Sequence, residues 1–260
     1  MSKILAALYG VVAYLVFLGS FLYAIAWVGG LPVPRTVDRG PEAPLAAALL
    51  VNSLLLAAFA IQHSGMARQG FKRWWTRIVP PVVERSTYVL ISSLLLIGMY
   101  VWWRPILPAV WTVERTVPAM LLQALFWSGW LLVLLSTFMI NHFELFGLRQ
   151  VWLNLKGHES SAVPFQVRFF YRFVRHPLLL GFIIAFWATP RMTAGHLLFA
   201  VGTTAYILVA IQLEERDLRR AYGRDYETYQ RSVPMLVPVP SRREQTRVGS
   251  STSAQPLRTE

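Results

Sequence analysis

The sequence predicts an all-α membrane protein, a polytopic helical bundle of about five to six spans that ends in a helical hairpin. Three observations support this class. Of the 260 residues, 55% are hydrophobic and only 15% are charged, whereas soluble domains carry about 25% charged residues. The apolar residues form long, nearly uninterrupted runs. The charged residues lie between these runs and at the end of the chain, which is typical of loops between membrane spans.

The first apolar run, 4–28, carries no charge and is long enough for a tilted transmembrane helix. Lys3 and the Ala-Ile-Ala sequence at 24–26 are also typical of a secretory signal peptide. The apolar stretch is too long for one, however, and further spans follow. After a loop rich in Gly and Pro, the second span is expected over 45–62. It contains Asn52, whose amide is expected to hydrogen-bond to another helix.

A basic loop, 63–86, follows the second span, and its Trp74 and Trp75 are expected at the level of the lipid headgroups. The third span is predicted over 87–103. A short loop with three prolines leads to the fourth span, 119–140. Each of these runs is long enough to cross the hydrocarbon core as a helix.

The last two apolar runs, 178–189 and 194–213, are joined by a turn at Pro190-Arg191 and form the predicted hairpin. The first arm is too short to cross a core of about 30 Å upright. It is therefore expected to be a short span or a re-entrant arm that other helices shield from lipid. Residues 1–240 are expected to form one domain, and the polar residues 241–260 a disordered tail.

The distribution of basic residues predicts the orientation. With the N-terminus inside, 20 of the 25 Lys and Arg residues lie on the cytoplasmic side, as the positive-inside rule requires. This topology explains the net charge of +12 better than nucleic-acid binding does. The chain has no cysteine, which excludes disulfides and Cys-based metal sites. Its five histidines lack metal-ligand spacing, so no metal is expected.

Two clusters of chargeable residues flank the hairpin. Arg175-His176-Pro177 leads into its first arm, and Glu214-Glu215-Arg216-Asp217 follows its second. Proline suits the first turn of a helix, so His176 could simply precede a helix start. Glu215 and Arg216 could form a surface ion pair worth about 0–1 kcal/mol. Because the hairpin brings both clusters to one membrane surface, we predict a functional site there.

A further polar cluster lies where the fourth span ends. Asn141 and His142 stand next to each other, and Glu144 follows on the same turn. The cluster could be a helix end that faces water, or it could form a wall of a reaction site, because histidine exchanges protons near neutral pH. The other histidines are expected at the far interface or in loops: His196, His63 and His158.

The motifs resemble those of the isoprenylcysteine carboxyl methyltransferase superfamily, membrane enzymes that use S-adenosylmethionine. The resemblance rests on these residues: Arg175-His176-Pro177, Gly181, Glu214-Glu215, Gly223, Tyr226, Tyr229 and Pro234. Within the superfamily, the chain is similar to the bacterial branch that converts methanethiol to dimethyl sulfide. The similar segments cover nearly the whole chain outside the tail: 62–64, 71–77, 84–88, 136–150 and 186–215.

The resemblance implies which residues bind the cofactor. On this basis S-adenosylmethionine is held by Arg175, His176, Pro177 and Gly181, with Glu214 or Glu215 and Tyr226 or Tyr229 closing the site. Leu179 stands where many superfamily members have Tyr, so a hydroxyl contact is missing or is supplied from elsewhere. His142, oriented by Asn141 or Glu144, is the predicted acceptor of the proton of the thiol, because few thiols are ionised near neutral pH.

The expected partners are a small volatile thiol and the lipid bilayer, without nucleic acid or metal, and the oligomeric state stays open. The expected location is the bacterial inner membrane, with the site facing the cytoplasm. Three alternatives share parts of the pattern. They are a methyltransferase for a lipid or prenylated cysteine, a non-catalytic accessory protein of nitrogen-oxide respiration, and an NADPH-dependent reductase of the steroid-reductase type.

Overall fold

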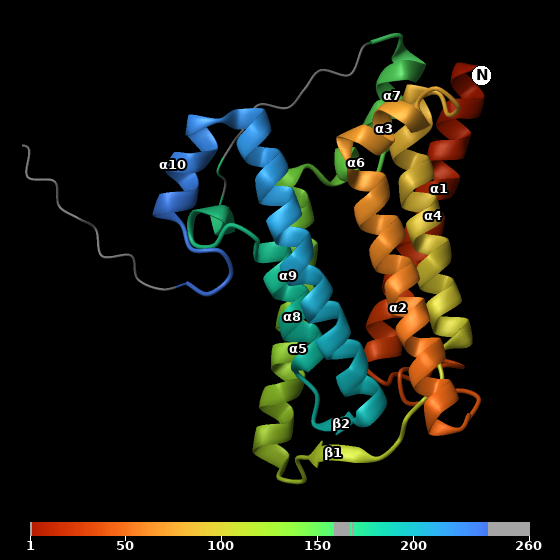
Figure 1. The fold of residues 1–260 in the computed structure, drawn as a ribbon, viewed down its shortest axis with the longest axis vertical. Helices are drawn as coiled ribbons and strands as arrows, with labels where there is room; N and C mark the ends of the chain where they lie inside the picture. Colours follow the sequence, from red (N-terminus) through yellow and green to blue (C-terminus); the bar gives the residue numbers. More distant parts are fainter. Residues whose placement is uncertain (1, 159–166, 168, 239–260) are drawn as a thin grey trace, which may run out of the picture.

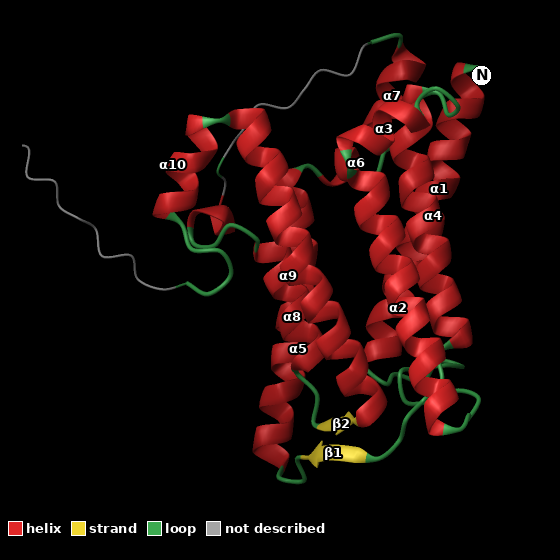
Figure 2. Ribbon diagram, viewed as in Figure 1, coloured by secondary structure: helices red, strands yellow, loops and turns green. Residues whose placement is uncertain are grey.

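The computed structural model describes residues 2–158, 167 and 169–238, and these form helices apart from two short strands (Figures 1 and 2). Within the described residues, five helices are long and apolar enough to cross a membrane: α1 (Lys3–Val28), α2 (Leu45–Ala67), α4 (Pro81–Trp102), α5 (Thr116–Ile140) and α9 (Ala194–Tyr222). A shorter apolar helix, α8 (Pro177–Trp187), precedes α9. The predicted class, span number and hairpin are confirmed. The predicted tail, 241–260, lies outside the described residues.

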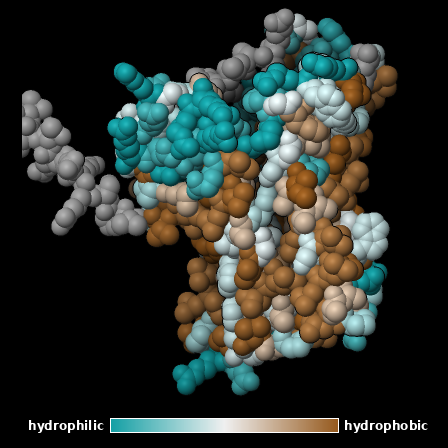
Figure 3. Space-filling model, viewed as in Figure 1, coloured by the Kyte–Doolittle hydropathy of each residue, from teal (hydrophilic) through white to brown (hydrophobic). Residues whose placement is uncertain are grey.

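The remaining elements gather at the two ends of the bundle. One end, which we call the charged end, carries α3 (Gln69–Trp75), α6 (His142–Leu145), α7 (Leu148–Lys156), the 3-10 turn Phe169–Arg172 and α10 (Arg224–Ser232). The other, the sheet end, carries β1 (Ala109–Thr112) and β2 (Arg191–Thr193), which pair in antiparallel fashion. Figure 3 shows hydrophilic side chains massed at the charged end and an apolar band below them. This arrangement matches a helical bundle that crosses a bilayer.

Three helices extend beyond the apolar runs that predict them. α2 continues to Ala67, α4 already starts at Pro81, and α9 runs nine residues past Leu213 to Tyr222. A helix satisfies its own backbone hydrogen bonds, so it continues into the polar interface while long side chains reach toward water. The prediction that His63 lies in a loop was therefore wrong, because His63 lies on the last turns of α2.

The helices form two groups, which Figure 1 shows side by side. α1, α2, α4 and α7 pack together, while α5, α8 and α9 form the second group. α5 and α8 meet at two glycines: a Cβ on Gly181 would lie 2.7 Å from the carbonyl oxygen of Gly129. Small residues permit this close approach of two membrane helices. The short arm α8 is thus shielded by α5 and α9, as a helix too short to span requires.

The sheet end is closed by aromatic packing and by backbone hydrogen bonds. Trp27, Trp103 and Phe199 lie against one another with ring centroids 5.2 to 6.0 Å apart. The amide of Asn52 donates to the carbonyl of Arg104 at 2.8 Å and accepts from its N–H at 2.9 Å. Asn52 thus bonds to the backbone just beyond α4 instead of to another helix. His196, expected at the interface, is buried and bonds to the carbonyl of Phe186 at 2.9 Å.

Candidate active site

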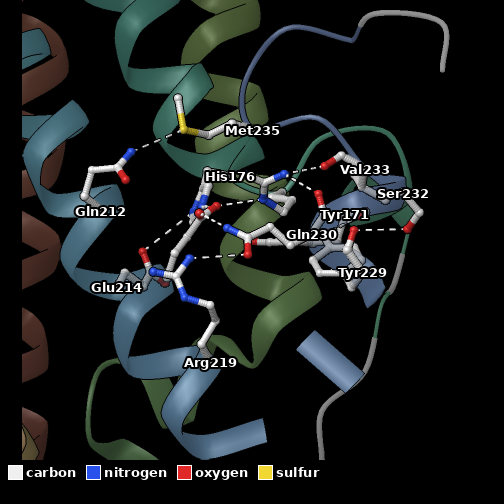
Figure 4. Close-up of polar contacts among 12 residues, drawn as sticks. Tyr171, His176, Gln212, Glu214, Arg219, Tyr229, Gln230, Ser232, Val233 and Met235 are labelled. Atoms are coloured by element: carbon white, nitrogen blue, oxygen red, sulfur yellow. Dashed lines mark hydrogen bonds and ion pairs between the residues drawn. The ribbon is translucent and has the colours of Figure 1, made fainter. Parts of the chain in front are cut away.

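A buried carboxylate, Glu215 of α9, joins several segments at the charged end, and Figure 4 shows its neighbours His176, Glu214 and Gln230. Its Oε1 accepts a hydrogen bond from Nε of Arg175 at 2.7 Å and lies 3.1 Å from Nε2 of His176. Its Oε2 accepts from the amide of Gln230 on α10 at 2.6 Å. The hairpin therefore brings the two predicted clusters together, because Arg175 and His176 directly precede α8 while Glu215 lies near the end of α9.

The segment that follows α10 returns to the start of α8. The backbone N–H groups of Arg175 and His176 donate to the carbonyls of Pro234 and Met235 at 2.9 and 3.2 Å. The guanidinium of Arg175 also donates to the carbonyls of Gln230 and Val233. Arg175 thus fixes the C-terminal segment against the hairpin. Each of these hydrogen bonds of Arg175 joins it to another group of the protein.

The two neighbouring glutamates of α9 have different surroundings. The side chain of Glu215 is 4% exposed, whereas that of Glu214 is 53% exposed. Oε2 of Glu214 lies 3.7 Å from Nδ1 of His176, so the imidazole stands between the two carboxylates. A buried charge is tolerated only when it is paired and hydrogen-bonded, which describes Glu215. Glu214 is the carboxylate of the cluster that a ligand can reach.

Several residues expected near the cofactor have clear structural contacts. Pro177 is buried at the first position of α8, where its fixed φ suits the helix. Gly181 packs against Gly129. Leu179, in place of the superfamily Tyr, packs beside the buried Ile207 and Ile211. At this position the chain therefore has an apolar contact in place of a hydroxyl.

Tyr226 and Tyr229 of α10 are buried beside the cluster. The hydroxyl of Tyr229 donates to the carbonyl of Tyr171 at 2.6 Å. Burial raises the pKa of Tyr229 to about 12, although the nearby Arg175 opposes the shift. Burial likewise raises the pKa of Tyr226. Both phenols therefore stay protonated near neutral pH.

The second predicted cluster lies where α5 passes into α6, and its bonds differ from those predicted. His142 lies 2.9 Å from the hydroxyl of Tyr14 through Nε2 and 2.9 Å from that of Thr137 through Nδ1. Asn141 and Glu144 instead bond to each other at 3.0 Å, and Glu144 also pairs with Arg149 at 3.1 Å. The prediction that Asn141 or Glu144 orients His142 was therefore wrong.

The hydrogen-bond network defines the protonation of His142. The hydroxyl of Thr137 donates to the carbonyl of Leu134 at 2.7 Å, so its oxygen is left to accept from Nδ1–H of His142. Nε2 then carries the lone pair and accepts from Tyr14. Burial lowers the pKa of His142, which favours this neutral form near pH 7.

A third polar cluster, absent from the sequence predictions, lies between α2, α4 and α9. It contains His63, Tyr88 and Ser92, with Tyr206 of α9 opposite. The available signal was spacing: Tyr88 and Ser92 are four residues apart and share one face of a helix. The second apolar run ends at Gln62, and for this reason His63 was not predicted to lie on the helix.

These features define a class: a multi-pass helical membrane protein with a buried ionic cluster and a neutral histidine, His142, near its charged end. The chain is 57% identical to methanethiol S-methyltransferase from Mycobacterium tuberculosis. The alignment covers 93% of this chain and 99% of that protein. It is 52% identical to methanethiol S-methyltransferase 2 from Bradyrhizobium diazoefficiens, with 91% of each chain covered. It is also 33% identical to Nurim from Bos taurus over 64% of this chain and 66% of that protein.

The chain belongs to the methanethiol S-methyltransferase family, and the family predicted from its motifs is confirmed. No family model matches the chain. No solved structure matches it either.

Proposed function

We propose that this protein methylates methanethiol at sulfur to give dimethyl sulfide, with S-adenosylmethionine as the methyl donor. The observation that carries the proposal is the charged end itself, where His176 stands between Glu214 and Glu215 in a chain of this family. We also propose that the protein lies in the bacterial inner membrane. The basic residues at the charged end support a site that opens toward the cytoplasm.

The residues of the charged end fit such a cofactor. S-adenosylmethionine carries a sulfonium and an amino group, and both are cations that a reachable carboxylate attracts. Glu214 is half exposed and offers that carboxylate, while Glu215 is occupied by Arg175, His176 and Gln230. When bound, S-adenosylmethionine supplies a methyl group that a sulfur nucleophile can take.

The roles of the cluster residues follow from their contacts. We propose that Glu214 and His176 contact the cofactor, and that Glu215 and Arg175 hold His176 in place. Tyr226 and Tyr229, both buried on α10, are proposed to close the site, and the hydroxyl of Tyr229 ties α10 to the carbonyl of Tyr171. Two further residues expected at the cofactor, Pro177 and Gly181, shape the start of α8 and seat it on α5.

A thiol reacts best after it loses its proton, since only a few per cent of a thiol with a pKa of about 8.5 is ionised near neutral pH. Asn141, His142 and Glu144 are proposed to form the wall of the reaction site on the α5–α6 side; the sequence also predicts His142 as one candidate for the proton acceptor. Burial lowers the pKa of His142, which favours a neutral imidazole whose Nε2 faces the hydroxyl of Tyr14. The neighbouring Phe138 and Phe146 provide aromatic surfaces that sulfur contacts well.

The test is direct. Purified protein is given S-adenosylmethionine and methanethiol, and dimethyl sulfide is measured in the headspace, with binding of the cofactor followed by calorimetry. We expect dimethyl sulfide to form only when both substrates are present. A folded protein that binds the cofactor and forms no dimethyl sulfide contradicts the proposed acceptor. A folded protein that does not bind the cofactor contradicts the proposed site.

A further inference from the structure

His63 is held by two neighbours on the adjacent span α4. Its Nε2 lies 3.0 Å from the hydroxyl of Tyr88, and its Nδ1 lies 3.2 Å from the hydroxyl of Ser92. The ring of Phe59, one turn earlier on α2, stacks on the imidazole with centroids 5.1 Å apart and planes 19° from parallel. We call His63, Tyr88 and Ser92 the α2–α4 triad.

The bonds of Ser92 define which nitrogen of His63 carries the proton. The hydroxyl of Ser92 donates to the carbonyl of Tyr88 at 2.9 Å and lies 3.2 Å from the amide oxygen of Gln62. Its oxygen is therefore left to accept from Nδ1–H of His63. The lone pair of His63 is then on Nε2, beside the hydroxyl of Tyr88. The triad thus presents a basic nitrogen next to a hydroxyl that can pass on a proton.

The triad faces α9, the helix that carries Glu214 and Glu215. The ring of Tyr206 on α9 meets the imidazole of His63 edge to face with centroids 6.4 Å apart, and its hydroxyl is 3.4 Å from that of Ser64. Arg68, which directly follows α2, pairs with Asp217 of α9 at 2.8 Å. Asp217 lies three residues after Glu214, so these two side chains are neighbours on the helix surface.

A polar cluster within a span can serve only to join helices, but two features of this one go further. His63 and Tyr206 are half-buried and not fully enclosed. The cluster also adjoins cations: Arg85 lies over the ring of Tyr88 at 5.2 Å and donates to the carbonyl of Leu145 in α6 at 2.8 Å. A developing negative charge on a sulfur here is stabilised by this field.

We propose that the α2–α4 triad is the acceptor subsite, where a small thiol binds against Phe59 and Tyr206 and transfers its proton to Nε2 of His63. The inference rests on the proposed function. In this step the S–H bond breaks and an N–H bond forms, directly or through the hydroxyl of Tyr88, and the sulfur keeps the electron pair. Overall, thiol and sulfonium donor give thioether, the neutral sulfide of the donor and one proton, which His63 releases to water.

On this assignment Ser92 is a positioning residue, because it acts only by fixing the proton on Nδ1 of His63. His142 then shapes the wall of the site, and the proton of the thiol does not go to it. Phe59 and Tyr206 favour a small apolar thiol, since aromatic faces contact both its methyl group and its sulfur.

The first test is the variant His63→Phe, which keeps a flat ring on Phe59 but removes the nitrogen. We expect turnover to fall at least about 100-fold, the loss typical of a missing general base, with affinity for S-adenosylmethionine unchanged. A more acidic thiol, 2,2,2-trifluoroethanethiol, should restore much of the lost rate relative to wild type, because it ionises without help. Wild-type turnover in His63→Phe overturns the proposal.

A second readout needs no turnover. The S–H stretching band of methanethiol bound without the cofactor is recorded by infrared spectroscopy. We expect this band at lower frequency in the wild type, where S–H donates to His63, and at its apolar-solvent position in His63→Phe. An identical band in both proteins shows that His63 does not touch the thiol and overturns the proposal, even where the proposed methyl transfer itself fails.

Tyr88→Phe tests the triad independently if His63→Phe does not fold. We expect about a five- to tenfold loss of turnover, the effect of one hydrogen bond, with normal thermal stability. The matched control is Tyr100→Phe on the same helix, whose hydroxyl donates to the carbonyl of Ser20 at 3.1 Å, far along α4 from the triad. Equal losses of turnover in Tyr88→Phe and Tyr100→Phe contradict a specific role for Tyr88.

Discussion

The molecule contains two histidines with nearly the same bonds and different surroundings. His63 and His142 each lie against a serine or threonine hydroxyl through Nδ1 and against a tyrosine hydroxyl through Nε2. Each also stacks on a phenylalanine. His63 faces Tyr206 of α9, whereas His142 lies between α1 and a group of phenylalanines. The hydrogen bonds therefore favour the same neutral form for both histidines, and the two differ in the elements that surround them.

The largest expected effect concerns Glu215, the buried carboxylate that joins α9 to the start of α8 and to α10. Glu215→Gln leaves Arg175 buried without its carboxylate partner, and such a loss costs about 3–5 kcal/mol of stability. We expect a large fall in the melting temperature in detergent, together with loss of cofactor binding.

The matched control is Glu214→Gln, one residue earlier and half exposed. We expect its melting temperature to stay close to that of the wild type while its affinity for S-adenosylmethionine falls about tenfold or more, as for loss of one charge-assisted contact. Similar melting temperatures for the two variants contradict the assignment of Glu215 as the buried carboxylate that stabilises the cluster.

The second prediction sharpens the comparison by testing how the α8–α9 arm is seated. In Gly181→Ala the new Cβ lies 2.7 Å from the carbonyl oxygen of Gly129, so the helices must move apart. We expect a loss of about 1–3 kcal/mol, typical of overpacking. Gly65→Ala in α2, where nothing lies near the new Cβ, should be neutral or stabilising by up to about 1 kcal/mol. Equal stability of both variants contradicts the tight α5–α8 contact.

The smallest effect is a pH dependence that belongs to His142. Because burial lowers its pKa below the ordinary value of 6.5, the unfolded chain binds the proton more readily than the folded protein. This neutral histidine contributes stability above about pH 6.5, and the contribution is lost as the pH falls. In His142→Phe the decline of melting temperature between pH 7 and 5 should be shallower than in the wild type. Parallel curves mean that the pKa of His142 does not differ between folded and unfolded chain.

The sequence predicts most of the fold because the apolar runs are long and the charges lie outside them. It also predicts that Arg175 and His176 meet Glu215, since a hairpin returns its ends to one surface. It does not predict the strands β1 and β2, each too short to show an alternating pattern. The sequence does not predict which of Glu214 and Glu215 is buried. Neighbouring residues on a helix face different directions, and hydropathy does not show which of the two faces the protein interior.

The α2–α4 triad was missed for a related reason. The second apolar run ends at Gln62, so the sequence predicts His63 in a loop. In the structure α2 continues to Ala67. The partner residues of His142 were also missed, since Tyr14 is separated from it by 128 residues. Contacts between distant spans depend on how helices rotate and pack, and a single sequence carries no direct signal of that rotation.

The central claim is that location, and not bonding, distinguishes the two histidines. The most direct measurement is single-turnover formation of dimethyl sulfide by His63→Phe and His142→Phe, with the cofactor bound in advance at saturation. The account predicts a rate at least about 100-fold below wild type for His63→Phe, as for loss of a general base, and a rate within about threefold of wild type for His142→Phe. The reverse order of rates would contradict it and return the proton to His142.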